Sequence, residues 1–458
     1  IPGVAVSVVE DGELILARGF GVIDVDGDTP VDAHTAFANA STTKAMVAAA
    51  LLMLVDEERV ALDDPVVRHL PTLRFADPAL TPQITVRDLL THRTGLPSTD
   101  FWTFNQGMPI TEQLPRLELV EPVAPPRSKR IYQNTMYELA GLVIEAVSGE
   151  PWDVFVQRRL WLPIGMRETW ARRGAIPADH AQASAHDAVN GELRTIAHSL
   201  RPQVEDAAGS VWSTVSDMAR WAQFLLAGGV TASGERLLSE AAVDELFTPQ
   251  QIIAPGNFVP TEALTKPQWR SYGLGWYQQD FQGRKIDFHT GSLNGAVALL
   301  GIDRARGRSV MIMANREGAE LRHAALWEVM DERDEGSRPD WHAEVLALYR
   351  ERAAKGDAAW EKIVAGRLKN VGPSLPLAAY AGAYESARSG PLELHVDGDG
   401  LRLETLIRSY TLTPWHADTF LLMHRDWRRG AFARFELTPD GRISALEIFG
   451  DRFERPEP

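Results

Sequence analysis

The sequence contains no cysteine, and it has few lysines and no long apolar run. Without cysteine the chain can form no disulfide, thiolate nucleophile or cysteine metal site, and its redox compartment stays open. The longest apolar run, Ala45 to Val55, has 11 residues, whereas a membrane-spanning helix needs about 20. We therefore expect no transmembrane segment, and a periplasmic or secreted location and a cytoplasmic one both stay open.

Acidic residues outnumber basic ones, which gives the chain a formal net charge of −15. Such a charge repels phosphate backbones and anionic lipid surfaces, so we expect no nucleic acid partner. The 458 residues, 45% of them hydrophobic, exceed what one compact core normally uses, so at least two domains are expected. The first residue is Ile1 rather than methionine, which predicts that a leader or other upstream residues have been removed. The oligomeric state is left open.

Strand and helix signals come in blocks along the chain. A hairpin is predicted from VAVSVVE through an Asp-Gly turn to ELILARGFGVIDV, followed by a helix from about Thr42 to Glu58. Mainly helical structure is predicted from Val86 to about Leu226. Strands return in SYGLGWYQQD, KIDFHTG, GAVALLGID and SVMIMAN, so one sheet takes strands from both ends of this region. We expect an α/β (α+β) fold, in which an antiparallel sheet is flanked by helices and joined by an α-helical subdomain.

The C-terminal part of the chain has a different pattern. The stretch DERDEGSRPD is too polar to bury, and a helix is predicted near Trp341 to Lys369. After it, short alternating strands are separated by turns such as DGDG and PDG, which predicts an antiparallel β domain, a small barrel. We therefore divide the chain into a main domain at 1–330, a charged helical connector at 331–372 and the β domain at 373–458.

The barrel itself leaves two points open. Its interior can hold a small apolar ligand or be packed with side chains as a support without a lumen. The HRDWRRG segment at 424–430 is interpreted as a solvated hairpin end, with an approach to a cleft of the main domain as the alternative.

Ser41 and Lys44 form the motif S-x-x-K at the start of the apolar helix. A helix that begins just after Ser41 directs free N–H groups at its hydroxyl, and Lys44 lies one turn along the same face. Because this helix is apolar on nearly every side, Lys44 is expected to be buried, and a buried lysine beside a serine can act as its base. The alternative is an ordinary N-cap serine with a lysine that extends to solvent. With 21 serines and seven lysines, chance predicts about a third of one such match.

Tyr132 and Asn134 form a second motif, Y-x-N, before the helical segment MYELAGLVIEAVSG. A tyrosine hydroxyl near a lysine can transfer protons, and an asparagine amide can accept from the lysine and donate to a substrate carbonyl. Taken alone, the two residues also fit a packed loop tyrosine and an asparagine that holds a turn. His92, in THRTGLP, lies near the expected cleft, but a helix C-terminus that ends at Gly95 accounts for it.

The third motif is His289-Thr290-Gly291-Ser292 on a strand of the returning sheet. A strand edge offers backbone N–H and C=O groups to an extended substrate, and Gly291 allows a close approach. His289 alone also fits a structural histidine. No H-E-x-x-H spacing and no G-x-G-x-x-G motif between strand and helix is present, so we infer no metal and no cofactor.

Taken together and in this order, the three motifs resemble those of the serine β-lactamase and penicillin-binding protein superfamily. The closer likeness is to the class C β-lactamase-like branch, which includes D-aminopeptidases, D,D-peptidases and esterases. The supporting stretches IPGVAVSVVEDGE, VRDLLTHRTGLP, GLVIEAVSG, AAGSVWSTVSDMARW and SYGLGW spread the resemblance over roughly residues 1 to 330. The end of the chain, from AAYAGAY onward, more weakly resembles the lipocalin-like β domain of some peptidases of this group.

The resemblance implies a role for each motif residue. Ser41 would be the nucleophile, Lys44 its proton acceptor, Tyr132 the general acid and base, and Asn134 a contact to the substrate amide. The backbone N–H groups of Ser41 and Ser292 would form the oxyanion hole, on the strand that also carries Thr290 and Gly291.

His289 departs from the resembling families, whose third motif often begins with lysine. No E-x-x-x-N segment that resembles the class A deacylation base is found, so deacylation would fall to Tyr132 with Lys44. A mostly neutral imidazole would make less demand for a substrate carboxylate than a lysine. The resemblance therefore implies a serine hydrolase acting on small-molecule or short peptide substrates with amide, D-amino-acid peptide or ester bonds. A class C-like β-lactamase, or a penicillin-binding sensor that acylates without turnover, is the alternative.

Overall fold

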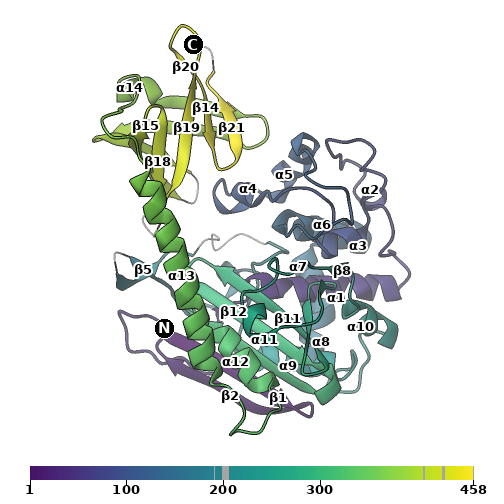
Figure 1. Cartoon of the computed structure of the whole chain (residues 1–458). Helices are drawn as coiled ribbons and strands as arrows, with labels where there is room; N and C mark the ends of the chain where they lie inside the picture. The colour runs from purple at the N-terminus through teal and green to yellow at the C-terminus, as the bar shows by residue number, and fades with distance from the viewer. Residues whose placement is uncertain (190, 199–205, 406–407, 425–428, 457–458) are drawn as a thin grey trace. The chain divides into compact units, whose positions relative to one another are not determined.

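The protein is described by a computed structural model that covers the whole chain except residues 190, 199–205, 406–407, 425–428 and 457–458. Most of the HRDWRRG segment thus lies outside the described residues. The contacts divide the chain into two compact units (Figure 1). Unit 1 comprises Ile1–Ser98 and Glu121–Tyr349, and unit 2 comprises Thr99–Val120 and Arg350–Pro458.

An eight-stranded antiparallel sheet forms the centre of unit 1 (Figure 1). Its strand order, β2-β1-β13-β12-β11-β10-β9-β8, places the N-terminal hairpin beside strands that return late in the chain, as the sequence predicts. The bounds are β1 (Gly3–Glu10), β2 (Glu13–Gly21), β8 (Gln251–Ile252), β9 (Arg270–Tyr272), β10 (Tyr277–Phe281), β11 (Arg284–Leu293), β12 (Ala296–Asp303) and β13 (Arg308–Ala314).

The segment SYGLGWYQQD contains two of these strands rather than one. A turn separates β9 from β10, so that Tyr272 pairs with Tyr277. Gly275 has a φ of +82°, a backbone conformation that glycine adopts at little cost, and the N–H of Gly273 donates to the carbonyl of Trp276 at 2.8 Å. The glycines therefore reverse the chain inside the predicted strand.

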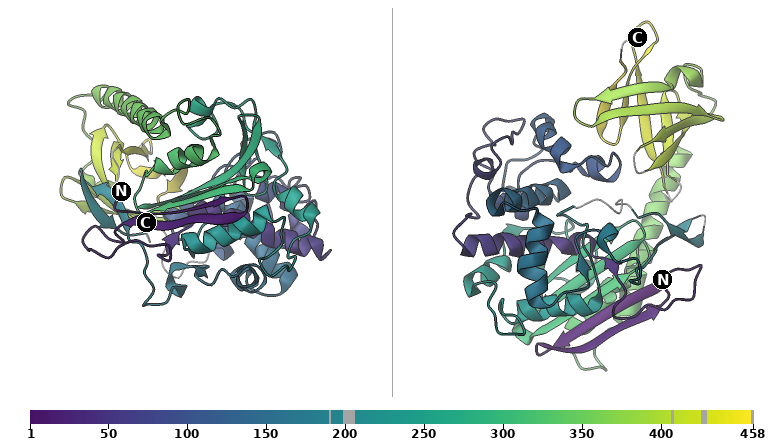
Figure 2. Two further views of the ribbon diagram at one scale, coloured as in Figure 1. Left: turned by 90° about the horizontal axis from the view of Figure 1, so that it is seen from below. Right: turned by 180° about the vertical axis from the view of Figure 1, so that it is seen from behind.

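Helices cover both faces of this sheet. Side chains of β1 alternate between the two faces, and the partly buried valines at positions 4, 6 and 8 belong to the core beneath α12 (Leu321–Met330). Helix α9 (Val215–Leu226) contacts β1, β2 and β13. In the view from below in Figure 2, the green α12 lies on one side of the sheet and the teal α9 on the other. Successive side chains of the strands thus point alternately toward two helical layers.

Helix α1 (Thr43–Asp56) is the buried helix that the apolar run predicts. Every residue from Thr43 to Leu54 is buried, because α1 contacts α6 (Asn134–Ser148), α7 (Trp152–Val156) and α10 (Glu240–Leu246). The other elements of unit 1 are β3 (Phe37–Ala38), η1 (Ala40–Thr42), α2 (Val66–His69), α3 (Val86–Leu90), η3 (Gln157–Trp161), α8 (Leu162–Ile164), β4 (Thr169–Trp170), η4 (Arg173–Ala175), β5 (Ala185–Val189), β6 (Glu192–Ile196), β7 (Trp212–Ser213), α11 (Glu262–Thr265) and η5 (Arg304–Arg306).

Unit 2 contains a closed antiparallel barrel in which eight strands follow one another in chain order. Its interior is packed with side chains, among them Tyr380, Tyr410, Phe420 and Phe435, which favours a packed support over a ligand-filled lumen. The strands are β14 (Gly382–Ser386), β15 (Gly390–Asp397), β16 (Gly400–Glu404), β17 (Ser409–His416), β18 (Thr419–Met423), β19 (Ala431–Leu437), β20 (Ile443–Ile448) and β21 (Asp451–Glu454). They follow α13 (Trp341–Ala365), where unit 1 ends and unit 2 begins, and α14 (Leu377–Tyr380).

The segment Thr99–Val120 belongs to unit 2, although it lies early in the chain. It forms α4 (Asp100–Phe104), α5 (Ile110–Arg116) and η2 (Leu117–Leu119). Phe101 stacks on Phe449 with ring centres 4.5 Å apart, and the indole N–H of Trp102 donates to Ser389 Oγ at 3.2 Å. The Nδ2 atom of Asn105 donates to a barrel tyrosine hydroxyl at 2.5 Å. Residues that the sequence assigns to the main domain thus pack against the barrel.

The expected fold class is confirmed: a large antiparallel sheet with helices is joined in one chain to an eight-stranded antiparallel barrel. Within the described ranges, none of the helices combines the length and the apolar composition that a membrane crossing requires.

Candidate active site

Ser41 lies on a tight turn between a short strand and the buried helix. Strand β3 leads into η1, and α1 begins two residues after Ser41. Ala40 has a φ of +47°, which is strained for a residue with a side chain, and the hydroxyl of Thr42 donates to the carbonyl of Asn39 at 2.9 Å. The turn presents Ser41, which is only partly buried, at the N-terminal end of α1. This arrangement is the one that the S-x-x-K motif predicts.

Lys44 is completely buried and turned toward Ser41. Its Nζ lies 3.1 Å from Ser41 Oγ, and it donates to Asn134 Oδ1 at 2.7 Å and to the carbonyl of Ala208 at 2.8 Å. The ring of Tyr132 has its centre 4.9 Å from the same nitrogen. The first two motifs therefore meet at Lys44, and the alternative of a lysine that extends to solvent is wrong for this residue.

The Y-x-N motif is held in place by buried polar contacts. Asn134 is the first residue of α6, and Gln133 before it has an extended backbone. The Nε2 atom of Gln133 donates to the carbonyls of Leu96 and Pro97, the latter at 2.8 Å. These bonds fasten the loop that carries Tyr132 to the THRTGLP turn.

His289 is buried on β11, and both of its ring nitrogens are hydrogen bonded. Nδ1 lies 2.7 Å from the carbonyl of Thr290 and Nε2 lies 2.8 Å from the hydroxyl of Tyr272. Burial lowers the pKa of His289 well below its ordinary value, and the charge of Lys44 adds to this effect. The neutral ring therefore donates from Nδ1 to the carbonyl, which can only accept, and receives the hydroxyl proton of Tyr272 at Nε2.

Strand β11 continues past the end of β10, so its last residues have a ladder partner on one side only within the described residues. The pairing with β10 ends at Phe288, whereas the pairing with β12 continues to Leu293. Thr290, Gly291 and Ser292 lie on this stretch. Arg322 on α12 holds it from behind, because its Nη1 donates to the carbonyl of Gly291 and to Ser292 Oγ, the latter at 3.0 Å.

His92 lies among the tyrosines of this site, although the sequence analysis explained it by a helix end near the cleft and gave it no role there. Its ring centre is 4.2 Å from that of Tyr132 and 5.0 Å from that of Tyr272, and its Nδ1 accepts from the backbone N–H of Gln133 at 3.2 Å. Burial lowers the pKa of His92 well below its ordinary value, and the charge of Lys44 adds to this. Because a helix end accounted for His92 in sequence, no local pattern marked it as part of the site.

Two buried carboxyl groups lie behind Lys44. Glu138, one turn after Asn134 on α6, is within hydrogen-bonding reach of Asp206 and accepts from the N–H of Ala207. Asp206 in turn accepts from the N–H of Ala208 at 2.6 Å. Burial and then the neighbouring Asp206 raise the pKa of Glu138 well above its ordinary value of 4.5. Glu138 therefore keeps its proton to a higher pH than an ordinary glutamate, and it is hydrogen bonded to Asp206 next to the chain segment whose Ala208 carbonyl accepts from Lys44.

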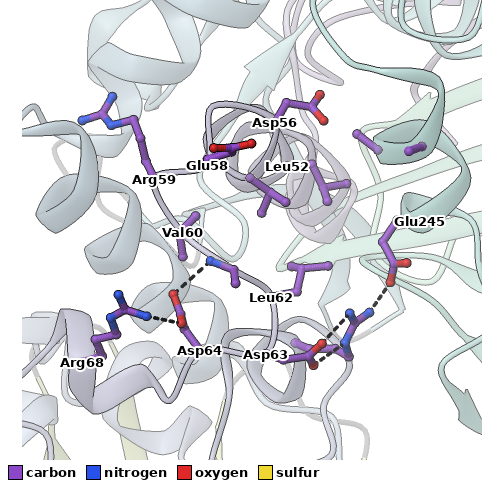
Figure 3. A pocket seen from close by; sticks show the side chains of 15 residues that line it. Leu52, Asp56, Glu58, Arg59, Val60, Leu62, Asp63, Asp64, Arg68 and Glu245 are labelled. Carbon is purple, nitrogen blue, oxygen red and sulfur yellow. Dashed lines mark hydrogen bonds and ion pairs between the residues drawn. The ribbon is translucent and has the colours of Figure 1, made fainter.

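A separate pocket of about 530 Å³ lies at the far end of α1 (Figure 3). It is lined by residues such as Asp56, Asp64 and Arg87, and α1 separates it from Ser41 by about 20 Å of helix. Arg87 pairs with Asp63 at 2.8 Å and also with Glu245, and Figure 3 labels both of these acidic residues. Arg68 pairs with Asp64 on the same wall, and no residue of the three motifs lines the pocket. Within the described ranges, no three histidine, aspartate or glutamate side chains are grouped as metal ligands.

Known proteins give the same picture of the two parts of the chain. The family model described as Beta-lactamase matches residues 1–335, and the Domain of unknown function DUF3471 matches residues 367–457. The unguisins hydrolase ungD of Aspergillus violaceofuscus is 30% identical over 98% of this chain and 85% of its own length.

Solved structures agree in fold. The octameric penicillin-binding protein homologue from Pyrococcus abyssi is 23% identical, covers 99% of this chain and 96% of its own, and has a TM-score of 0.63. A D-stereospecific amidohydrolase from Streptomyces sp. is 27% identical over 69% of this chain and 89% of its own, with a TM-score of 0.54. With a match over residues 1–335 and a hydrolase relative along nearly its whole length, the chain belongs to the beta-lactamase family of the serine β-lactamase and penicillin-binding protein superfamily.

Proposed function

We propose that the protein is a serine hydrolase that forms an acyl-enzyme on Ser41 and cleaves amide bonds, including those of D-amino-acid peptides, and esters. The observation that carries the proposal is the set of contacts made by Lys44. Two relatives, one named as a hydrolase and one as a D-stereospecific amidohydrolase, support the amide interpretation.

Lys44 is placed to act as the base. Asn134 Oδ1 and the carbonyl of Ala208 can only accept hydrogen bonds, so each takes one N–H of the Lys44 nitrogen. Once Lys44 has given up its charge, its amine could donate to these two oxygens and accept the proton of the Ser41 hydroxyl, 3.1 Å away. The Ser41 oxygen would pass its proton to Nζ while it bonds to the carbonyl carbon of the substrate.

The remaining steps use the other motif residues. The negative oxygen of the tetrahedral intermediate would be stabilised by the backbone N–H groups of Ser41 and Ser292. Tyr132, beside Lys44, would give a proton to the leaving amine or alcohol as its bond to the carbonyl carbon breaks. Water would then attack the acyl-enzyme and lose a proton to Tyr132, and Lys44 would return its proton to the Ser41 oxygen as that oxygen leaves. His289 would hold Tyr272 rather than contact the substrate, because both of its ring nitrogens are hydrogen bonded.

The test is turnover of a panel by wild type and Ser41→Ala, with mass spectrometry of a fluorophosphonate adduct. The panel contains D- and L-aminoacyl p-nitroanilides, short acyl esters and nitrocefin. We expect turnover and a single adduct on Ser41 in the wild type, and neither in Ser41→Ala. Ser337→Ala, which changes an exposed serine, is the matched control and keeps both. Activity that survives Ser41→Ala contradicts the proposal, and a permanent adduct without turnover favours the sensor alternative.

Lys44→Met keeps the length of the side chain and removes its nitrogen. We expect the acylation rate to fall by about 10²- to 10⁴-fold, the range for loss of a general base. Lys355→Met, at an exposed lysine of α13, is the control and leaves the rate unchanged. A rate that is equal in the two variants would remove Lys44 from the mechanism.

A further inference from the structure

A second cationic side chain lies beside Tyr132, on the loop that precedes α6. The guanidinium carbon of Arg130 is 5.8 Å from the ring centres of Tyr132 and Tyr272, and 5.0 Å from that of Tyr277. Its Nη1 donates to the hydroxyl of Tyr277 at 3.1 Å, and its Nη2 donates to the carbonyl of Asn257 at 3.2 Å. The positive charge of Arg130 is thus held against three rings, and all three also lie around His289.

Arg130 has no anionic partner among the residues that the structure describes. Both of its hydrogen-bond acceptors are neutral, and its buried Nε has no hydrogen-bond partner in the described part of the chain. Arg127, three residues earlier, shows the usual arrangement, because its Nη2 and Nε both bind the carboxylate of Asp88, at 2.7 and 3.1 Å. A planar guanidinium offers five N–H groups in a fork that fits a carboxylate, and Arg130 uses two of them on neutral oxygens.

The other basic side chains of the site are not available to bind an anionic group of a substrate. His289 is neutral, and its two ring nitrogens are hydrogen bonded to Tyr272 and Thr290. Lys44 is fully buried and turned toward Ser41, Asn134 and Ala208. Arg130 is only partly buried and borders Tyr132. It is therefore the cation of this group that a bound substrate can reach without displacing a contact of the Ser41–Lys44 pair.

We infer that Arg130 binds an anionic group of the substrate, and that the site favours amides and esters that carry a carboxylate near the bond to be cleaved. The inference rests on the proposed function and names the substrate class for the same site. It replaces the expectation based on His289 alone, which left Arg130 out. The charge comes from the loop before α6, and not from strand β11.

Matched substrate pairs test the inference. One pair is N-acetyl-D-Ala-D-Ala and its C-terminal amide, and the other is N-succinyl- and N-acetyl-D-alanine p-nitroanilide. Each pair differs by one carboxylate, on opposite sides of the reacting carbonyl. We expect wild type to prefer the anionic member of at least one pair in kcat/KM, and Arg130→Gln to lose that preference by about 10- to 100-fold while the neutral member changes little. Because arginine stays charged, the wild-type preference is expected to persist from pH 6 to pH 9.

Lys129→Gln is the matched control, since it removes the same charge from the adjacent, exposed residue of the loop. It should leave both preferences as they are. Arg130→Lys keeps the charge without the fork and should restore part of the preference, which a merely structural role would not predict.

Two results separate the possible failures. The inference is overturned, and the hydrolase proposal stands, if Ser41-dependent turnover is present but Arg130→Gln lowers kcat/KM equally for both members of each pair. The same holds if wild type shows no preference for the carboxylate-bearing members. If no substrate is turned over and Ser41 takes up no fluorophosphonate, the proposed function and the inference both fall. Protection of Ser41 from that probe by N-acetyl-D-alanine, in wild type but not in Arg130→Gln, supports the inference without requiring turnover.

Discussion

Gly291 on β11 is in direct contact with Asn39, at the turn that carries Ser41. A Cβ atom placed on Gly291 would lie 2.4 Å from the carbonyl oxygen of Asn39, 2.9 Å from Ala40 Cβ and 3.1 Å from the backbone nitrogen of Ser41. The first two distances are shorter than real Cβ contacts. The absence of a side chain at Gly291 therefore lets the strand pack closely against the turn that carries Ser41. This is in addition to any close approach of a substrate to the strand.

We expect Gly291→Ala to displace the turn of Ser41 from β11. Overpacking of this kind typically costs about 1–3 kcal/mol of unfolding free energy, and a displacement of about 1 Å at a nucleophile can lower its reactivity about 100-fold. Thermal unfolding and the rate of fluorophosphonate labelling measure the two effects. Gly27→Ala is the control, because the nearest atom to a Cβ there is 3.9 Å away. Equal labelling rates in the two variants would show that the turn and the strand adjust to the added methyl group.

Glu138 is expected to make the stability of unit 1 depend on pH. Its pKa is raised in the folded chain above the ordinary value of 4.5, first by burial and then by Asp206. Between the two pKa values the folded state therefore holds a proton that the unfolded state has lost. The stabilising contribution of this proton to the unfolding free energy is complete below about pH 4.5. It is lost as the pH rises through the folded pKa, with a slope of up to about 1.4 kcal/mol per pH unit.

Glu138→Gln keeps a hydrogen-bond donor toward Asp206 and cannot lose a proton. The unfolding free energy of wild type, measured by urea titration from pH 5 to pH 9, should fall relative to that of Glu138→Gln as the pH rises. Glu344→Gln, at an exposed position of α13, should run parallel to wild type. Parallel curves for all three proteins would mean that Glu138 carries no extra proton in the folded state.

The segment Thr99–Val120 is expected to depend on the barrel. We compare two shortened proteins that both end at Tyr349, one with the native segment and one in which a short Gly/Ser linker replaces residues 99–120. In the first, Phe101 and Trp102 have lost Phe449 and Ser389, and each exposed large side chain forfeits about 1.5–3 kcal/mol of burial. The protein with the linker should bind less of an apolar dye and unfold at a higher temperature. Equal behaviour would mean that the segment folds without the barrel.

The parts of the site that depend on local spacing could be predicted from the sequence. Ser41 and Lys44 are three residues apart, and an apolar helix implies a buried lysine, so their contact follows from one element. The contact between Lys44 and Asn134 spans 90 positions, and the order of motifs in a resembling family suggested it. The roles assigned to the motif residues, including Tyr132 and Ser292, stay predictions.

The parts that sequence reasoning missed depend on how distant elements pack. His92 and Arg130 are single residues on loops, and no periodicity distinguishes them from other loop residues, yet both lie against Tyr132. Glu138 is one charged residue of a helical segment, and no local pattern in the sequence indicates that Asp206 lies beside it. Likewise, the alternating pattern of the barrel strands says that one face is buried, but not that Phe101 joins it from nearly 350 residues away.

The two-part origin of unit 2 imposes an order on folding during synthesis. Residues 99–120 leave the ribosome long before residues 350–458, and the partners of Phe101 and Trp102 do not yet exist at that time. At a synthesis rate of about 5–20 residues per second, the two aromatic side chains lack their barrel contacts for at least about ten seconds. The surroundings of Ser41 can assemble in that interval, whereas unit 2 becomes complete only after the last strand of the barrel has been made.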